Sequence, residues 1–308
     1  MDRTKPKIIV IAGPTASGKT AAAIDAARKF GGEIVSADSI QIYRHMDLGS
    51  AKPTLEQRSL VPHHMIDIRN PDEDFSVGDY MREGRRYVRE ILSRGRIPMV
   101  VGGTGLYIRA LLGGIADIPP SDRDLRARLC DKERRDGRGA LYKRLQHVDP
   151  VIAVGVQPNN LHRIIRALEV FELTGKRMSD IQKEHSFRDR PYQYIFICIS
   201  PPRRVLYERI DKRVDSMINE GLIEEVYSLH EMGYSRDLKA LQSLGYRHAG
   251  MIVWGEMDHA DAIVLLKRDT RRYAKRQLTW FRSEPDALWC DPDARTEIDS
   301  MVGNFLGH

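Results

Sequence analysis

The chain has 308 residues, 42% of them hydrophobic and 30% charged, with a formal net charge of +6. This composition excludes a disordered or fibrous protein, and no apolar run is long enough to span a bilayer. The first residues do not form a signal peptide, so we expect a cytoplasmic protein without membrane contact. Cys130, Cys198 and Cys290 lie far apart, which excludes a disulfide framework or a zinc knuckle. The basic surplus favours a polyanionic partner, although many ordinary enzymes carry such a charge.

Short apolar runs alternate with helical patterns in the first third of the chain. Strands are predicted at Lys7–Ala12, Glu33–Ser36 and Ile97–Val101, and helices at Gly18–Phe30 and Asp79–Arg94. Strands separated by helices imply right-handed crossovers and therefore a parallel sheet.

Helical patterns dominate from Ile118 to about Arg190, where almost no strand signal occurs. The clearest helix is Leu161–Leu173, which Thr174 and Gly175 end. Its predicted apolar face consists of Leu161, Ile164, Ile165, Leu168 and Phe171. A strand returns at Tyr194–Ser200, and helices are expected from there to the end. The sequence thus predicts an α/β fold with a parallel sheet core in two parts, residues 1–117 and 192–308, and a helical insertion domain at 118–191.

A complete G-x-x-x-x-G-K-[ST] motif follows the first predicted strand and opens the first predicted helix. Glycines let the backbone N–H groups point at phosphate oxygens, and the helix N-terminus adds its positive dipole end. Lysine supplies a point charge, and threonine a hydroxyl suited to Mg²⁺. The motif therefore predicts a phosphate site, but it does not say which phosphate compound binds. Its residues are Gly13, Pro14, Thr15, Ala16, Ser17, Gly18, Lys19 and Thr20.

Asp38 follows the second predicted strand, and Thr104 follows the third in a glycine-flanked turn. Ligands of such sheets bind beyond the carboxyl ends of the strands, so both side chains should face the phosphate loop. Asp38 could bind magnesium or act as a general base, and either residue could instead be only a helix cap. The third strand ends without the carboxylate expected of a nucleotide hydrolase.

Eight segments together resemble the tRNA dimethylallyltransferase (tRNA isopentenyltransferase) family. They occur in the family's order over roughly residues 7–283 and read GPTASGKT, SADSIQIYRHMDLGSAKP, HHMIDI, VVGGTGLYIRALLGG, LHRIIRALEVFELTGK, RRVLYERIDKRVDSMINEGLIEEV, LGYRH and TRRYAKRQLTWFR. The chain ends without the zinc finger that some relatives carry, so it is most similar to the shorter, bacterial-type members. The resemblance implies a P-loop NTPase/kinase-like core, with an insertion domain that grips tRNA.

The resemblance also implies an activity: transfer of a dimethylallyl group from dimethylallyl diphosphate to N6 of the adenosine 3′-adjacent to the anticodon. The phosphate loop would then hold the diphosphate of the donor rather than ATP. Lys19 and Arg213 would contact the diphosphate, Thr20 would bind Mg²⁺, Asp38 would be the base, and Thr104 would steady the donor. The implied partners are the tRNA anticodon stem-loop and dimethylallyl diphosphate, the cofactor is Mg²⁺, and we expect a monomer.

The family's tRNA contacts map onto three segments and two single residues. They are Asp38, Ser39, Ile40 and Gln41; His162, Arg163, Ile164, Ile165 and Arg166; Gln242, Ser243, Leu244, Gly245, Tyr246 and Arg247; and the single positions Thr104 and Arg126. A basic stretch from Lys267 to Arg276 has helical spacing and could contact RNA phosphates or form a solvated face. His63 and His64 point oppositely on an extended segment, so a structural or substrate-lining role is expected rather than metal binding.

Three other functions compete with this interpretation. A small-molecule kinase would need ATP and a mobile arginine lid, but the insertion is large for a lid. A nucleotide-driven RNA switch is disfavoured because the third strand ends without a carboxylate. A relative that prenylates free adenine nucleotides is disfavoured by the helical insertion.

Overall fold

The computed structural model describes residues 5–185 and 187–307. Contacts divide the chain into two compact units, one formed by residues 1–112 and 190–308 and the other by residues 113–189. The first, which we call the core unit, contains the sheet. The second, the insertion unit, overlaps the predicted insertion at 118–191, and its bounds differ by a few residues at each end. In the part of the chain that the structure describes, no helix is long and apolar enough to cross a membrane.

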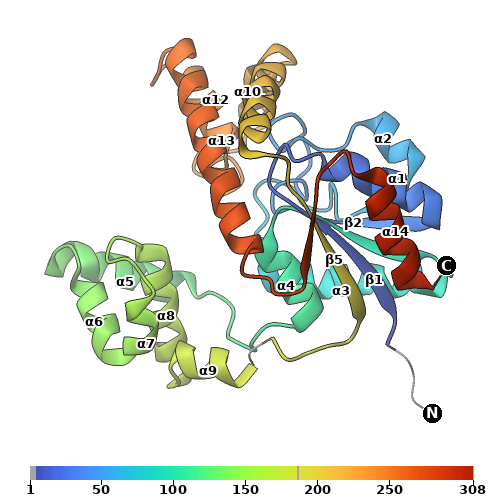
Figure 1. Cartoon of the computed structure of the whole chain (residues 1–308). Helices are drawn as coiled ribbons and strands as arrows, with labels where there is room; N and C mark the ends of the chain where they lie inside the picture. Colours follow the sequence, from blue (N-terminus) through green and yellow to red (C-terminus); the bar gives the residue numbers. More distant parts are fainter. Residues whose placement is uncertain (1–4, 186, 308) are drawn as a thin grey trace. The chain divides into compact units, whose positions relative to one another are not determined.

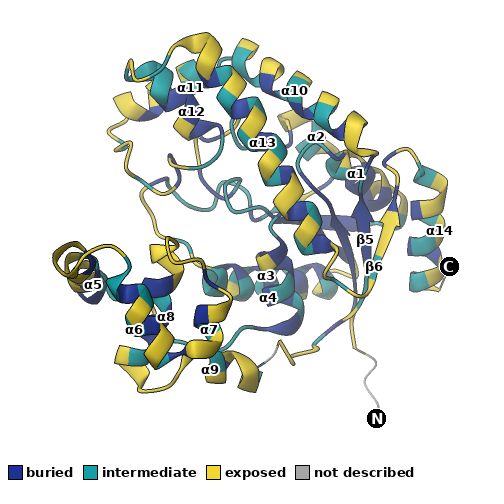
Figure 2. Ribbon diagram, turned by 60° about the vertical axis from the view of Figure 1, so that its left-hand side comes forward, coloured by how far each residue is buried: buried dark blue, intermediate teal, exposed yellow. Residues whose placement is uncertain are grey.

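Six parallel strands form one sheet in the order β3-β2-β4-β1-β5-β6. They are β1 (Lys7–Ala12), β2 (Gly32–Ala37), β3 (His63–His64), β4 (Ile97–Gly102), β5 (Gln193–Ile199) and β6 (Ala287–Cys290). The four predicted strands and the parallel sheet are confirmed. The expectation of helices alone after the fourth strand is wrong, because β6 adds an edge strand to β5. Figure 2 shows β6 as an exposed edge beside the buried β5.

The sheet is buried because helices cover both of its faces (Figure 1). One face packs Ile9 and Ile11 of β1 against α1 and α14. The other packs Ile8 and Val10 against α3, α4 and Phe281 of α13. Such two-sided burial explains why the parallel strands read as continuous apolar runs. The helices of the core unit are α1 (Lys19–Phe30), α2 (Leu55–Leu60), α3 (Val77–Ser93), α4 (Gly105–Gly113), α10 (Arg203–Asn219), α11 (Leu222–Glu231), α12 (Tyr246–Val253), α13 (His259–Phe281) and α14 (Arg295–Leu306).

A further cluster of apolar side chains lies beyond the carboxyl ends of the strands, where α10, α11, α12 and α13 pack together (Figure 1). Ile42, Tyr43 and Met46, from the segment after β2, are buried in the same cluster. The segment that carries Asp38 and Gln41 is therefore held between the sheet and these helices. This packing fixes the place where a ligand can meet the phosphate loop.

The insertion unit is built from α5 (Arg123–Asp136), α6 (Ala140–Val148), α7 (Pro150–Val154), α8 (Leu161–Thr174) and α9 (Met178–His185). Its core includes Ile164, Ile165 and Leu168 of α8, as the apolar pattern predicts. Leu161 departs from that prediction, because its side chain is 38% exposed at the start of the helix. The predicted stop is confirmed, since Gly175 ends α8 in the left-handed conformation with a φ of 70°.

Candidate active site

The phosphate loop joins β1 to α1 and leaves the N-terminus of that helix open to an anion. Gly18 precedes α1 with a φ of 90° and no side-chain cap, a conformation that glycine adopts most easily. Gly13 lies so close to β5 that a Cβ atom there would meet the carbonyl oxygen of Ile199 at 2.4 Å. The motif glycines therefore serve the backbone path of the loop, as the sequence predicts, and the helix dipole favours a phosphate at its end.

Two cations converge on this loop. Lys19 donates a hydrogen bond of 3.1 Å to the carbonyl of Pro14, and Arg213 of α10 lines the same cavity. Burial and, to a lesser extent, the charge of Arg213 lower the pKa of Lys19 to about 8, although the charge of Asp38 opposes the shift. Burial also lowers the pKa of Arg213. Lys19 and Arg213 have lost much of their solvation by water. A multiply charged anion bound at the phosphate loop would compensate their two positive charges.

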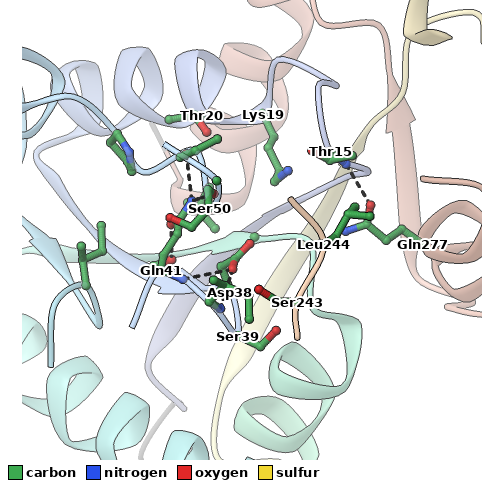
Figure 3. Close-up of a pocket in the computed structure, with 18 of the residues that line it drawn as sticks. Thr15, Lys19, Thr20, Asp38, Ser39, Gln41, Ser50, Ser243, Leu244 and Gln277 are labelled. Carbon is green, nitrogen blue, oxygen red and sulfur yellow. Dashed lines mark hydrogen bonds between the residues drawn. The ribbon is translucent and has the colours of Figure 1, made fainter. Parts of the chain in front are cut away.

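Asp38 follows β2 and faces the loop across a cavity of about 230 Å³ (Figure 3). In the figure Lys19 and Asp38 point into this cavity from facing sides. One carboxylate oxygen of Asp38 accepts hydrogen bonds from the backbone N–H groups of Ile40, at 2.9 Å, and Gln41, at 3.3 Å. Asp38 therefore caps a turn rather than a helix, and it also presents a carboxylate to the cavity.

The predicted contact segment after Asp38 forms one wall of the cavity. Ser39, Ile40 and Gln41 all line it, and the side chain of Gln41 also forms hydrogen bonds within the loop. Gln41 accepts a hydrogen bond of 3.0 Å from the hydroxyl of Ser36 and donates one of 3.1 Å to the carbonyl of Ala51. Gln41 thus fixes the wall that Ser39 and Ile40 present.

A second predicted contact segment forms another part of the wall. Ser243 and Leu244 line the cavity, but Tyr246 is fully buried beneath it. The expectation of an RNA contact is therefore wrong for the side chain of Tyr246. In the same segment, the side-chain amide of Gln242 donates to the carbonyl of Arg236. Gly245 has a φ of 92° and lies against the backbone of the loop after β2. Arg247 is exposed and pairs with Asp269 at 3.3 Å.

Thr104 lies in the turn after β4, as the sequence predicts, and its N–H donates a hydrogen bond of 3.0 Å to Ala37 at the end of β2. Its hydroxyl is buried and lies beside the hydroxyl of Tyr273 of α13. Gly102, two residues earlier, and Tyr273 of α13 line the cavity. Burial and the charge of Asp38 raise the pKa of Tyr273, so this hydroxyl stays protonated.

Several residues that line the cavity were not predicted as site residues, among them Tyr273 and Gln277 of α13. Gln277 contacts both the phosphate loop and the turn before Thr104. The KRQLTWFR segment was part of the family resemblance, but its spacing alone does not show that this glutamine faces a loop some 260 positions away. His63 donates a hydrogen bond from Nδ1 to the carbonyl of Val61 at 2.7 Å and also lines the cavity, and Nε2 of His64 contacts the carboxylate of Glu33 at 2.8 Å. Both contacts are structural, and a substrate-lining role of His63 stays a prediction.

The residues present fit a magnesium ion shared with a bound phosphate compound. Within the described residues no group of three or more His, Cys, Asp or Glu side chains could hold a metal alone. The cavity does bring together the hydroxyl of Thr20 and the carboxylate of Asp38. Mg²⁺ in phosphate sites usually takes one or two protein oxygens and completes its shell with phosphate and water.

The basic stretch of α13 is only partly free for other partners. Lys267 pairs with Asp215 of α10 at 2.6 Å, and Arg271 pairs with Asp211 of the same helix. These two residues fasten α13 to α10. Arg272 is 62% exposed and has a long contact of 3.4 Å with Asp269. Lys267 and Arg271 therefore face α10 and stabilise the packing, whereas Arg272 belongs to an exposed basic edge of α13.

In the insertion unit, the predicted contact residues Arg126 and Arg166 converge on one buried carboxylate. Glu169 accepts from Arg126 at 2.8 Å and from Arg166 at 2.6 Å, and its side chain is 0% exposed. Burial alone would raise the pKa of Glu169, but the hydrogen bonds from the two arginines hold it below its ordinary value. These arginines thus form a fixed pair at the start of α5 and within α8.

Other predicted contact residues of α8 divide between surface and core. His162 and Arg163 are exposed. Ile164 and Ile165 are buried in the core of the insertion unit, so the expected RNA contact is wrong for their side chains. The side chains of this segment that are open to RNA include those of His162 and Arg163.

The chain is similar to proteins of one family along nearly all of its length. Residues 41–284 match the family model described as IPP transferase, and residues 6–67 match the one described as Isopentenyl transferase. The tRNA dimethylallyltransferase 1 of Syntrophotalea carbinolica is 50% identical over 98% of this chain and 96% of its own length. The tRNA dimethylallyltransferase of Geobacter sulfurreducens is 47% identical over 99% of this chain and 98% of its own.

Solved structures show the same likeness. The full-length tRNA isopentenylpyrophosphate transferase from Bacillus halodurans has a TM-score of 0.73 and 40% sequence identity, covering 98% of this chain and 97% of its own. A eukaryotic dimethylallyltransferase, captured acting on tRNA, has a TM-score of 0.83 and 27% identity, covering 98% of this chain and 80% of its own.

Proposed function

Because this chain belongs to the tRNA dimethylallyltransferase family, we propose that it transfers the dimethylallyl group of dimethylallyl diphosphate to tRNA. The acceptor is the exocyclic N6 amine of the adenosine 3′-adjacent to the anticodon, and diphosphate leaves. The observation that carries this proposal is the cavity in which the phosphate loop, Lys19 and Arg213 face the carboxylate of Asp38. It offers positive charge for a leaving diphosphate and a base for an incoming amine.

The cationic side of the cavity suits the departure of diphosphate. The allylic carbon–oxygen bond breaks while negative charge grows on the leaving oxygen. Lys19 and Arg213 are already desolvated, so their charges act in a site of low polarity and need no reorganisation during the reaction. Interactions that strengthen as this charge develops lower the barrier rather than merely increasing affinity.

The acidic side of the cavity suits activation of the amine. The lone pair of an adenine amine is delocalised into the ring, so the amine is a poor nucleophile. Asp38 can accept a hydrogen bond from it and remove the proton as the carbon–nitrogen bond forms, which typically contributes about 10² to 10⁴ in rate. The other carboxylate oxygen stays bound to the turn at Ile40 and Gln41, and this keeps the base in place. Thr104 would steady the donor from the turn after Gly102, which lines the cavity.

Thr20 would hold Mg²⁺, and the carboxylate of Asp38 lines the same cavity. Bound there, the ion neutralises charge on the diphosphate. The residues that position the donor are the loop N–H groups, Lys19 and Arg213.

RNA binding is assigned to basic and polar residues of both units. In the insertion unit these are Arg126, His162, Arg163 and Arg166; in the core unit they are Gln242, Arg247 and the exposed edge of α13. Contacts to phosphates supply affinity without reading the sequence. The adenine must leave its stack to reach Asp38, at a cost of a few kcal/mol that these contacts offset.

The test separates this activity from the two nearest alternatives. Enzyme, Mg²⁺ and isotope-labelled dimethylallyl diphosphate are incubated with an anticodon stem-loop or with free adenine nucleotides, with and without ATP. Label in the RNA without ATP supports the proposal. Label only in free nucleotides would make the chain a nucleotide prenyltransferase, and ATP turnover in place of transfer would make it a kinase.

A further inference from the structure

Gln277 of α13 joins two loops of the active site through both ends of its side-chain amide. Its oxygen accepts a hydrogen bond of 2.9 Å from the N–H of Thr15 in the phosphate loop, as Figure 3 shows. Its nitrogen donates one of 3.0 Å to the carbonyl of Gly103, the residue before Thr104. The side chain is buried and lines the cavity that holds Lys19. The orientation of the amide is fixed chemically, because one partner can only donate and the other can only accept.

The turn before and after Thr104 is shaped to receive α13. A Cβ atom on Gly103 would lie 2.3 Å from the amide nitrogen of Gln277. A Cβ atom on Gly105 would lie 2.2 Å from the ring of Trp280, three residues further along the same helix. Both contacts are closer than any side chain allows, so two glycines of the GGTG segment are needed for the approach of α13. This packing locks the turn from one side.

Gln277 therefore sets the spacing between two parts of the reaction centre. Thr15 belongs to the loop that holds the leaving diphosphate, and Gly103 carries the turn of Thr104. The phosphate loop and this turn lie at the ends of the neighbouring strands β1 and β4. Parallel strands alone allow the loops at their ends to move independently, whereas a buried amide that binds both loops does not.

We propose that Gln277 is a positioning residue of the transfer reaction, which holds the phosphate loop and the Thr104 turn in the spacing that the transfer requires. This role rests on the proposed function. It requires one donor and one acceptor at the end of a side chain of this length, which a primary amide provides. A protonated carboxyl group provides the same pair, but a carboxylate or a thioether does not.

The experiment compares Gln277→Glu and Gln277→Met with the wild-type enzyme in steady-state prenylation of the stem-loop. Near neutral pH both variants should lose about 10- to 100-fold in kcat, because small displacements of reacting groups cost this much. In Gln277→Met, which adds no charge, KM for dimethylallyl diphosphate should change little, since Lys19 and Arg213 remain. As the pH is lowered from about 8 to about 6, the activity of Gln277→Glu relative to wild type should rise, because the buried carboxyl group takes up a proton. Gln277→Met should show no such recovery.

Val264→Glu is the matched control, because Val264 lies on the same helix and is 65% exposed. It adds the same carboxylate outside the cavity and should leave kcat and the pH profile as in the wild type. Melting temperatures of all variants show that each is folded at the assay temperature. Gly103→Ala is an independent second variant, since its methyl group displaces the amide of an intact Gln277, and it should lower kcat in the same way.

Wild-type kcat in Gln277→Met or in Gly103→Ala would overturn the positioning role. A loss in Gln277→Glu that follows the wild-type pH profile without recovery would also overturn it, as would a loss confined to KM. An inactive wild-type enzyme would instead overturn the proposed function, and this role would fall with it.

Discussion

The hydroxyl of Tyr246 donates a hydrogen bond of 2.5 Å to the carboxylate of Glu225. The same carboxylate accepts the backbone N–H groups of Asp47, at 3.1 Å, and Leu48, at 2.8 Å. Gly49 packs on the ring of Tyr246, where a Cβ atom would lie 2.5 Å away. Glu225 and Tyr246 therefore hold the loop that leads to Ser50 and Ala51 in the cavity wall.

Tyr246→Phe should lower the free energy of unfolding by about 1.5 to 3 kcal/mol, the range for a hydrogen bond to a charged group. Denaturant unfolding measures this change. The affinity for RNA should stay at the wild-type value, because the side chain is fully buried. Tyr227→Phe is the control on the neighbouring helix, since Tyr227 is 55% exposed, and it should change neither quantity. Weaker RNA binding with unchanged stability would restore Tyr246 as an RNA contact.

Asp38→Asn isolates the function of the base from that of the turn. The asparagine oxygen can still accept from Ile40 and Gln41, so the loop should keep its form. An amide cannot take the proton of the amine, and the single-turnover rate should fall by about 10² to 10⁴. Rapid quench with saturating RNA and donor measures this rate. A rate near that of the wild type would remove Asp38 from the chemistry.

The pKa of Lys19, lowered by burial to about 8, gives the donor step an alkaline limit. Below this pH the ammonium group is charged and binds diphosphate; above it the free enzyme loses that charge. Since kcat/KM reports the free enzyme, its value for dimethylallyl diphosphate should fall as the pH rises through about 8. Lys19→Arg, which stays charged, should show a lower kcat/KM that does not fall as the pH rises through about 8. If kcat/KM of Lys19→Arg also fell over this pH range, the fall would have to be assigned to another titrating group.

Glu169→Gln should destabilise the insertion unit, because it leaves Arg126 and Arg166 without a carboxylate. Breaking a buried pair by removing one partner costs about 3 to 5 kcal/mol. Because the folded pKa of Glu169 lies below its ordinary value, its contribution is complete above that value and is lost as the pH falls through the folded pKa. The difference in stability between the wild type and the variant should therefore shrink below about pH 4. Thermal unfolding at several pH values measures this difference.

The exposed pair of Glu172 with Arg144 provides the control for this change. Glu172→Gln should alter stability by less than about 1 kcal/mol, as exposed pairs generally do. An equal effect of both substitutions would show that burial of Glu169 contributes nothing.

The sequence predicts the parts of the site whose chemistry is local. The phosphate loop and Asp38 follow strands that are continuous apolar runs, and such runs are recognisable without the structure. The edge strands β3 and β6 were missed, because β3 has two residues and β6 exposes Leu288 and Trp289. Short strands whose pairing is set by neighbouring strands carry little signal of their own.

The residues that hold the site together could not be predicted, because their partners lie far away in sequence. Gln277 accepts a hydrogen bond from Thr15, which lies 262 positions away, and Glu169 accepts one from Arg126 of another helix. Nor does a family motif separate surface from core. Ile164 and Tyr246 lie in segments matched to RNA contact, yet tertiary packing buries both.

The most direct test is mass spectrometry of two anticodon stem-loops after incubation with the enzyme, Mg²⁺ and dimethylallyl diphosphate, without ATP. One RNA carries adenosine immediately 3′ of the anticodon, and the other carries guanosine there. Our account predicts the mass of one added prenyl group on the adenosine RNA alone, located by fragmentation at that nucleotide. An unchanged adenosine RNA in the presence of folded enzyme, or equal addition to both RNAs, would contradict it.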